Sequence, residues 1–262
     1  MDLKIGNVTL TSRLFVGSAL YPSPAIMQEA IRASGAQVVT VSLKRQAPAS
    51  QGGQFFWDII KDLGCRVLPN TAGCRLANDA VNVAEMSREI FGTSWIKLEV
   101  IGDDDTLQPH PFELVKAAEE LVKRGFTVFP YCTEDLILCQ KLRDLGCPVL
   151  MPWCAPIGSG QGLLNVFSLK ILRARIPELP LIIDAGIGKP SHAVEALELG
   201  FDGVLINSAL ALAHDPVGMA RAFAQGVEAG RRAYLAGTME PKNMAHPSTP
   251  LIETPFWTGT ER

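Results

Sequence analysis

The amino-acid sequence predicts a single closed (β/α)8 barrel over residues 1–237, followed by a proline-rich C-terminal tail over residues 238–262. Short apolar stretches alternate with helical stretches eight times, and the 262 residues fit the usual size of such a barrel. Strands that alternate with helices form parallel sheets. An open doubly wound sheet is the structural alternative, but no GxGxxG follows the first predicted strand, so closure is favoured.

The N-terminal region predicts a small hairpin, the first barrel strand and the first helix. Residues 3–10 form the hairpin, an addition that commonly closes the bottom of a barrel, and residues 14–17 form the strand. Start and stop signals for the helix agree. Ser23 is placed to cap it, Pro24 occupies its first position, and Gly35 lies just past its end.

Seven further apolar stretches supply the remaining strands. Six of them follow a glycine that closes the preceding helix, where glycine adopts the left-handed conformation easily. The predicted strands cover residues 38–41, 67–69, 95–101, 127–129, 149–151, 181–183 and 204–206. The tail from Thr238 holds four prolines and little periodicity. It is interpreted either as a mobile or partner-bound extension or as a simple disordered end.

Composition excludes several classes of protein. The formal net charge of -3 and a pI of about 5.8, with no basic run, argue against a nucleic-acid-binding surface. No stretch has the length of a membrane span, and the first residues lack the features of a signal peptide, so a cytoplasmic location is expected. The six cysteines show no CxxC spacing, which predicts core thiols rather than a zinc site or a disulfide framework.

Two charges interrupt the apolar stretch 95–101. Side chains alternate along a strand, so Lys97 and Glu99 share one face while the apolar residues share the other. If both faces of the strand are buried, the two charged side chains are neighbours in a site without water. A desolvated ammonium is expected to have a lowered pKa, which prepares the amine to attack a carbonyl and form an imine. The alternative is a structural ion pair.

Glycine-rich loops follow the last three strands. In a barrel the active site forms at the carboxyl ends of the strands. The loops at 155–162 and 184–188 would expose backbone N–H groups, and Asn207-Ser208 follows the last strand. Phosphate commonly binds between the loops after strands seven and eight, so a phosphorylated substrate is expected. Asp184 is a further charged residue at the end of an apolar stretch. Its side chain either caps the loop amides or takes part in catalysis.

The other candidate residues are weaker. Lys44 and Arg45 follow the second strand and either face the substrate or are solvated. Asn70 is a possible hydrogen-bond donor, and Cys74 is interpreted as a packing residue. The acidic run 103–105 is either a solvated loop or a metal site. The four histidines lie near helix starts or in the tail, without the order of a catalytic triad.

Four motifs carry a resemblance to a known family, and the two long ones, at 96–103 and 155–165, are highly specific. The four motifs are NTAGC at 70–74, IKLEVIGD at 96–103, APIGSGQGLLN at 155–165 and DAGIG at 184–188. Together they closely resemble thiazole synthase of bacterial thiamine biosynthesis, and the likeness runs from about Leu3 through Gly237. Two segments depart from that family, 51–56 and the tail around 245–250, so their contacts are not carried over.

The resemblance implies a reaction and its participants. The family, a group of sulfur transferases, condenses 1-deoxy-D-xylulose 5-phosphate, a dehydroglycine imine made by a separate enzyme, and sulfur from the thiocarboxylate of a sulfur-carrier protein. It implies an imine at Lys97, proton transfer by Glu99 and Asp184, no metal or organic cofactor, and a homotetramer. The residues implied to hold the substrate, chiefly its phosphate, are Gly158, Ala185, Gly186, Asn207 and Ser208.

Two other functions are compatible with the residues. One is another imine-forming barrel enzyme, an aldolase or a sugar-phosphate isomerase, which would share the lysine and the phosphate loops but would need no sulfur donor. The other is a non-catalytic barrel subunit that binds a sugar phosphate or a partner protein. The predicted burial of Lys97 beside Glu99 argues against the second, because an unneeded buried charge is a liability.

Overall fold

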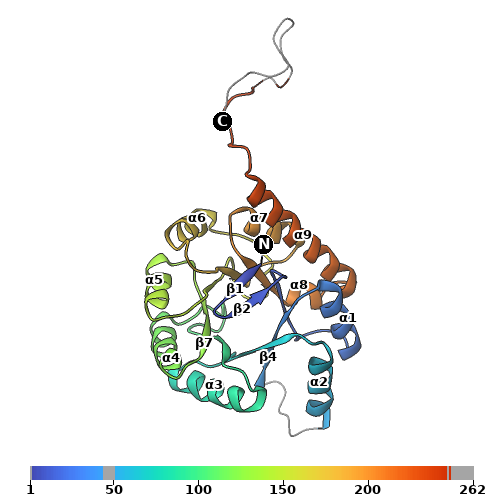
Figure 1. Cartoon of the computed structure of the whole chain (residues 1–262), viewed down its shortest axis with the longest axis vertical. Coiled ribbons are helices and arrows are strands. Elements are labelled where there is room, and N and C mark those ends of the chain that lie inside the picture. Colours follow the sequence, from blue (N-terminus) through green and yellow to red (C-terminus); the bar gives the residue numbers. More distant parts are fainter. Residues whose placement is uncertain (1, 44–50, 247, 249–262) are drawn as a thin grey trace, which may run out of the picture.

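The computed structural model describes residues 2–43, 51–246 and 248, and it confirms the (β/α)8 barrel (Figure 1). Eight parallel strands follow one another around the sheet in chain order, and the last pairs with the first. A parallel bridge between Leu150 and Leu181 joins the two ends of that sheet, so the barrel is closed. The strands are β3 (Leu14–Gly17), β4 (Val38–Ser42), β5 (Arg66–Asn70), β6 (Trp95–Leu98), β7 (Thr127–Cys132), β8 (Met151–Pro152), β9 (Ile182–Asp184) and β10 (Gly203–Ile206).

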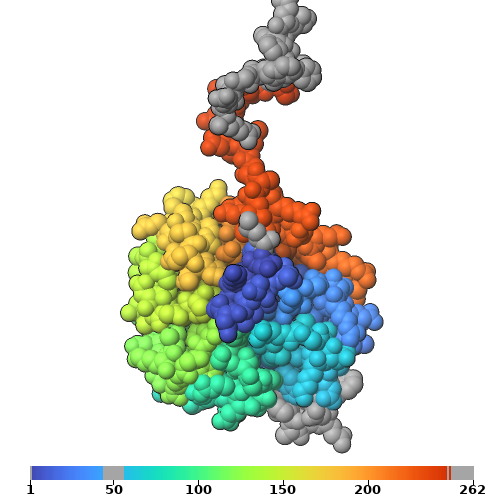
Figure 2. Space-filling view, in the orientation of Figure 1, coloured from blue at the N-terminus to red at the C-terminus, as the bar shows by residue number. Residues whose placement is uncertain are grey.

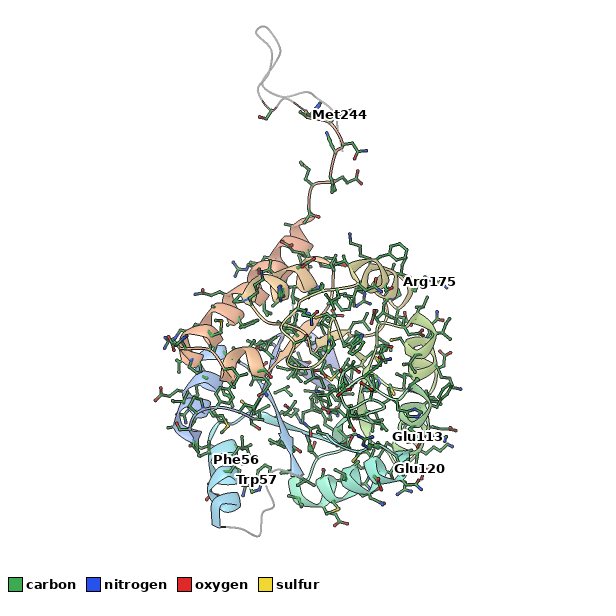
Figure 3. All side chains as sticks on the ribbon, turned by 180° about the vertical axis from the view of Figure 1, so that it is seen from behind. Phe56, Trp57, Glu113, Glu120, Arg175 and Met244 are labelled. Carbon is green, nitrogen blue, oxygen red and sulfur yellow. The ribbon has the colours of Figure 1, made fainter. Side chains whose placement is uncertain are left out.

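Helices surround the barrel in the same order. They are α1 (Pro24–Ser34), α2 (Gln51–Asp62), α3 (Ala77–Phe91), α4 (Pro111–Lys123), α5 (Leu136–Asp144), α6 (Val166–Arg175), α7 (Pro190–Glu198), α8 (Ser208–Ala211) and α9 (Pro216–Ala236). The predicted signals of the first helix are confirmed: the Ser23 side chain accepts a hydrogen bond from the Ile26 N–H, and Gly35 has a φ of 62°. Phe56 and Trp57 of α2 are buried against the barrel (Figure 3).

The N-terminal hairpin closes the amino end of the barrel. Its strands, β1 (Leu3–Ile5) and β2 (Val8–Leu10), pair antiparallel. Their buried side chains pack with residues that begin barrel strands, among them Val38 and Trp95. Figure 2 shows the hairpin, in dark blue, covering the centre of this end. The carboxyl ends of the strands are therefore left to form the site.

One predicted strand is shorter in the structure. The prediction ran from Trp95 to Ile101, but β6 ends at Leu98. The hydroxyl of Thr71 replaces the strand pairing at the next residue: it donates to the Glu99 carbonyl (2.7 Å) and accepts from the Glu99 N–H (2.8 Å). Glu99 therefore leaves the sheet while remaining fixed at its edge.

The chain leaves the barrel after α9. Residues 238–246 form neither helix nor strand, are exposed, and extend away from the barrel (Figure 1). Most of the remaining tail lies outside the described residues, as do Lys44 and Arg45, so the roles of these segments stay predictions. Within the described ranges, no helix combines the length and apolar character needed to cross a bilayer.

Candidate active site

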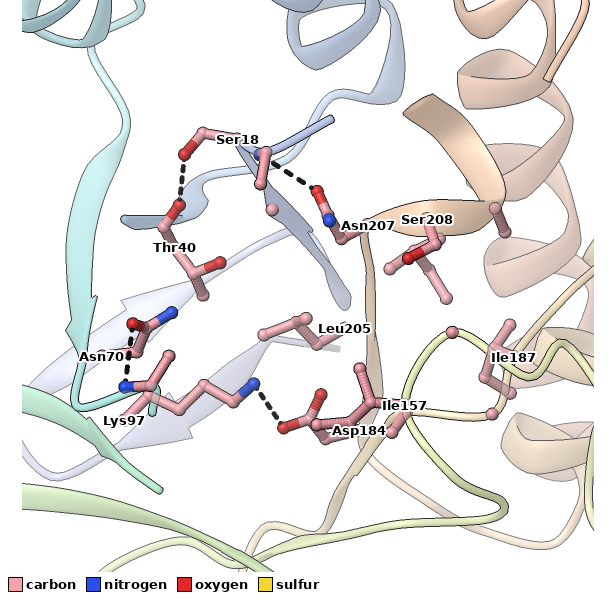
Figure 4. Close-up of a pocket in the computed structure, with 18 of the residues that line it drawn as sticks. Ser18, Thr40, Asn70, Lys97, Ile157, Asp184, Ile187, Leu205, Asn207 and Ser208 are labelled. Atoms are coloured by element: carbon pink, nitrogen blue, oxygen red, sulfur yellow. Dashed lines mark hydrogen bonds and ion pairs between the residues drawn. The ribbon is translucent and has the colours of Figure 1, made fainter. Parts of the chain in front are cut away.

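Three charged side chains meet at the carboxyl end of the barrel. Lys97 Nζ lies 2.6 Å from Asp184 Oδ2 and 3.0 Å from Glu99 Oε1. All three residues are buried, with exposed fractions of 5% for Lys97, 6% for Glu99 and 2% for Asp184. Figure 4 shows Lys97 and Asp184 pointing toward one another across the pocket. The predicted closeness of Lys97 and Glu99 is confirmed, and the fold adds Asp184 from β9.

The expected lowering of the Lys97 pKa is wrong. Burial alone lowers the pKa of this ammonium, but the carboxylates of Asp184 and Glu99 attract and hydrogen-bond it strongly enough to raise its pKa above the ordinary value. Burial raises the pKa of Asp184, and the Lys97 charge offsets this only in part. Lys97 therefore rests as an ammonium, and Asp184 is a better proton acceptor than an exposed aspartate.

Two buried residues that the sequence analysis missed hold this cluster. Thr71 is fully buried and fixes the backbone of Glu99 as described above. Tyr131 of β7 is also fully buried, and its ring centroid lies 5.6 Å from Lys97 Nζ, within range of a cation–π contact. The Tyr131 hydroxyl donates to the Leu107 carbonyl at 3.4 Å. In a sequence, a threonine or tyrosine at a strand end carries no signal of such a contact.

A cavity of about 300 Å³ adjoins the charged cluster. It is lined by Lys97, Glu99 and Asp184 and by every residue that the resemblance implied for substrate binding: Gly158, Ala185, Gly186, Asn207 and Ser208. The structure thus brings all the predicted site residues to one pocket. The volume is at the lower end of the range for small-ligand sites.

Close backbone packing shapes the glycine-rich side of this cavity. Gly186 has a φ of 81°, and a Cβ there would lie 2.5 Å from the backbone nitrogen of Ala155. A Cβ at Gly188 would lie 2.4 Å from the Gly160 carbonyl oxygen. Ala185 also has a positive φ, 72°, which is uncommon for a residue with a side chain. The loops after β8 and β9 therefore touch through backbone atoms, and glycine is required where they meet.

Asn207 joins the first and last strands of the barrel at the pocket. Its Oδ1 accepts a hydrogen bond from the Ala19 N–H at 3.2 Å. A Cβ at Gly17 would lie 2.4 Å from the same oxygen, so only glycine allows this approach. The side chain of Asn207 is thereby fixed on the cavity wall beside Ser208 (Figure 4).

Several of the weaker candidate residues have structural roles in the fold. Cys74 is buried in the core, as expected of a packing residue. Asp103 accepts hydrogen bonds from the N–H and hydroxyl of Thr106, so it orders an exposed loop. His110 caps α4, and His192 Nδ1 accepts from the Gly188 N–H at 3.2 Å. Among the described residues, no histidine, cysteine and acid side chains gather in a group that could hold a metal.

The fold and site define a class: a barrel protein with a buried lysine between two carboxylates at the carboxyl end of the strands, beside a cavity lined by glycine-rich loops. Residues 4–250 match the family model of the thiazole biosynthesis protein ThiG. The chain therefore belongs to the ThiG family, and its activity is thiazole synthesis for thiamine. The match extends past Gly237 into the tail, farther than the motifs indicated.

Individual relatives agree with the family match. The chain is 61% identical over 255 residues to a thiazole synthase of Bradyrhizobium sp. (strain ORS 278), covering 97% of this chain and 98% of the relative. It is 59% identical over 252 residues to a thiazole synthase of Coxiella burnetii (strain RSA 493 / Nine Mile phase I), covering 96% and 97%. These findings replace the aldolase, isomerase and non-catalytic alternatives.

Solved structures support the fold. The crystal structure of the Amycolatopsis orientalis BexX/CysO complex matches with a TM-score of 0.83 and 30% identity, covering 93% of this chain and 98% of that chain. Thiamine phosphate pyrophosphorylase from Pyrococcus furiosus matches with a TM-score of 0.59 and 15% identity, covering 83% and 96%. The second likeness shows the barrel fold alone.

Proposed function

We propose that the enzyme makes its thiazole from 1-deoxy-D-xylulose 5-phosphate, dehydroglycine and the sulfur of a carrier-protein thiocarboxylate, through an imine at Lys97. What carries this proposal is the cluster in which Lys97 Nζ lies 2.6 Å from Asp184 and 3.0 Å from Glu99 at the cavity wall. A lysine is the amine that forms imines with ketones in proteins, and it must first lose its proton.

Asp184 is suited to remove that proton. It is the nearer of the two carboxylates to Lys97, and burial raises its pKa above the ordinary value. The neutral amine adds to the substrate ketone carbon, and the ketone oxygen leaves as water after gaining two protons. Asp184 returns one of those protons. The result is a C=N bond between Lys97 and the sugar carbon, with no change of oxidation state.

Glu99 is placed for the next proton transfer. The C=N bond acidifies the C–H of the neighbouring carbon that carries a hydroxyl. Glu99 removes this proton, and the electron pair enters the carbon–carbon bond to give an enamine that bears a hydroxyl. Asp184, which is ionised again once the imine has formed, takes the hydroxyl proton, and Glu99 returns a proton to the former imine carbon. These transfers leave an amine at that carbon and a ketone next to it. That ketone is the electrophile for the sulfur of the carrier thiocarboxylate.

The glycine-rich side of the cavity is suited to the phosphate. Backbone N–H groups of the loops after β8 and β9, which contain Gly158, Ala185 and Gly186, can surround an anion without needing a lysine or arginine. Asn207 and Ser208 border the same region. With the phosphate held there, the rest of the sugar extends toward Lys97.

Partners follow from the same chemistry. The BexX/CysO structure is a complex, which supports docking of a sulfur carrier on this barrel. A separate enzyme supplies dehydroglycine, and Lys97 requires neither a metal nor an organic cofactor for the steps above. From the resemblance to its family we also expect the enzyme to be a cytoplasmic homotetramer.

Borohydride trapping tests the proposal. The purified enzyme is incubated with 1-deoxy-D-xylulose 5-phosphate, reduced, digested and analysed by mass spectrometry. We expect an adduct on the peptide that contains Lys97, absent in Lys97→Ala and retained in Lys123→Ala, whose lysine is exposed on α4. Thiazole formation should also require the carrier thiocarboxylate. An adduct on another lysine would overturn the proposed role of Lys97. The absence of any adduct, when the protein is shown to be folded, would overturn it as well.

A further inference from the structure

A polar wall faces the cavity on the side of β4 and β5, away from the glycine-rich loops. It contains Thr40 of β4 and Asn70, the last residue of β5, and both side chains point into the pocket in Figure 4. Asn70 pairs in register with Lys97 on the neighbouring strand. The two side chains therefore leave adjacent strands at the same level, and both line the cavity.

The orientation of the Asn70 side-chain amide follows from the one hydrogen bond that it makes with the described residues. The Ala72 N–H donates to Asn70 Oδ1 at 3.3 Å, which assigns the oxygen to the loop and the Nδ2 donors to the cavity. Among the described residues, Nδ2 has no hydrogen-bond partner. A pair of N–H donors thus faces the pocket beside Lys97.

The three charged groups of the cluster are not suited to donate a hydrogen bond to the substrate. Glu99 and Asp184 are carboxylates, which only accept hydrogen bonds when ionised. The Lys97 nitrogen is consumed by the imine. A substrate oxygen on the carbon beside the imine therefore needs a donor from another side chain, and Asn70 is on the strand next to Lys97.

We propose that Asn70 donates a hydrogen bond to the substrate oxygen on the carbon next to the ketone carbon, and stabilises that oxygen as the carbonyl migrates onto it. This inference rests on the proposed imine at Lys97. In the migration, the C–H proton passes to Glu99, Asp184, which is ionised again once the imine has formed, takes the hydroxyl proton, and Glu99 returns a proton to the former imine carbon. Negative charge grows on the oxygen as its proton leaves, and a fixed donor in a buried site strengthens its bond at that moment.

The test separates imine formation from the migration step. Asn70→Asp removes the donors while keeping an oxygen that can accept from the Ala72 N–H. Asn82→Asp, on the exposed face of α3, is the matched control for the same chemical change. Each protein is given 1-deoxy-D-xylulose 5-phosphate in D₂O. Trapped imine is measured after borohydride. Deuterium at the former imine carbon of the reduced Lys97 adduct is measured by NMR of the digested peptide, because that carbon takes a proton from the solvent pool only when the carbonyl has migrated.

We expect Asn70→Asp to trap imine at the wild-type level and to gain deuterium at the former imine carbon about 10²-fold more slowly, the usual loss on removing one such donor. Asn82→Asp should match wild type in both. An unchanged rate of deuterium uptake at the former imine carbon in folded Asn70→Asp would overturn the inference. Loss of the imine itself would also overturn it, because Asn70 would then act earlier.

The inference and the proposed function fail differently. If wild-type enzyme traps no imine, the proposed function is overturned and this inference with it. If wild type traps imine but deuterium uptake at the former imine carbon does not depend on residue 70, only this inference is overturned. Asn70→Ser also keeps an acceptor near the loop while lacking the amide. It is judged by the same criteria and replaces Asn70→Asp if that variant does not fold.

Discussion

Lys97 Nζ and Asp184 Oδ2 lie 2.6 Å apart, although one residue belongs to β6 and the other to β9. Only closure of the barrel brings these strands face to face. A buried ammonium that is paired on two sides by carboxylates is held in place and charged, so it needs a nearby base before it can act as a nucleophile. The same pair therefore sets both the stability and the reactivity of the site.

Removing the lysine should destabilise the protein most at neutral and alkaline pH. Lys97→Ala leaves Glu99 and Asp184 buried together without a cation, at a cost of about 3–5 kcal/mol. The pKa of Asp184 is already raised above its ordinary value of 3.8, and losing the Lys97 charge raises it further. A raised carboxyl pKa in the folded state means that stability is lost as the pH rises above that ordinary value.

Urea unfolding at pH 5 and pH 8 checks this prediction. The deficit of Lys97→Ala relative to wild type should be larger at pH 8. Adding Asp184→Asn to the same variant removes one of the stranded carboxylates and should recover part of the loss at pH 8. A deficit that is equal at both pH values would show that lost packing, rather than stranded charge, is responsible.

Thr71 should be needed for the position of Glu99. Thr71→Val keeps the shape but removes both hydrogen bonds to the Glu99 backbone, and leaves a buried N–H without its partner at a cost of about 1–3 kcal/mol. Thr71→Ser keeps the hydroxyl. We expect Thr71→Val to lower kcat for thiazole formation with little change in KM, and Thr71→Ser to restore kcat. Equal kcat values for the two variants would contradict this role.

Gly186 should be required for phosphate binding. Gly186→Ala places a Cβ 2.5 Å from the Ala155 backbone nitrogen, so the loops after β8 and β9 must separate. Gly125→Ala is the matched control, because Gly125 also has a positive φ, 78°, but has nothing within 4 Å of its Cβ position. We expect both variants to lose about 1 kcal/mol or more from strain. Only Gly186→Ala should raise the KM for the sugar phosphate, by at least about tenfold.

Much of this molecule was predictable from sequence because two regularities are local. Alternation of apolar strands and glycine-ended helices located all eight barrel strands, and the period of two in 95–101 placed Lys97 beside Glu99. The direction of the Lys97 pKa shift was predicted wrongly, because it depends on the distance to Asp184 across the barrel. Thr71 and Tyr131 were missed because their contacts depend on the pairing of β5 with β6 and on ring orientation, which no sequence period encodes.

Asp184 should be the group that takes the proton from Lys97. Asp184→Asn keeps the size of the side chain but cannot accept that proton, so kcat/KM should fall by about 10²–10⁴-fold. The Lys97 pKa also falls without this carboxylate, because Asp184 raises it in the wild-type enzyme. In the variant the free amine then forms mainly by loss of its proton to solvent. The remaining rate should therefore rise with pH, by up to about tenfold per unit between pH 7 and pH 9, while the Lys97 pKa stays above that range.

Profiles of kcat/KM against pH for wild type, Asp184→Asn and Glu99→Gln check this assignment. Glu99→Gln keeps Asp184 beside Lys97, so the free amine still forms within the site. Its rate should fall at the later C–H step without the steep rise. If Glu99→Gln shows the steep rise and Asp184→Asn does not, the two carboxylates have exchanged roles. In that case the 2.6 Å contact between Lys97 and Asp184 holds the amine in place without accepting its proton.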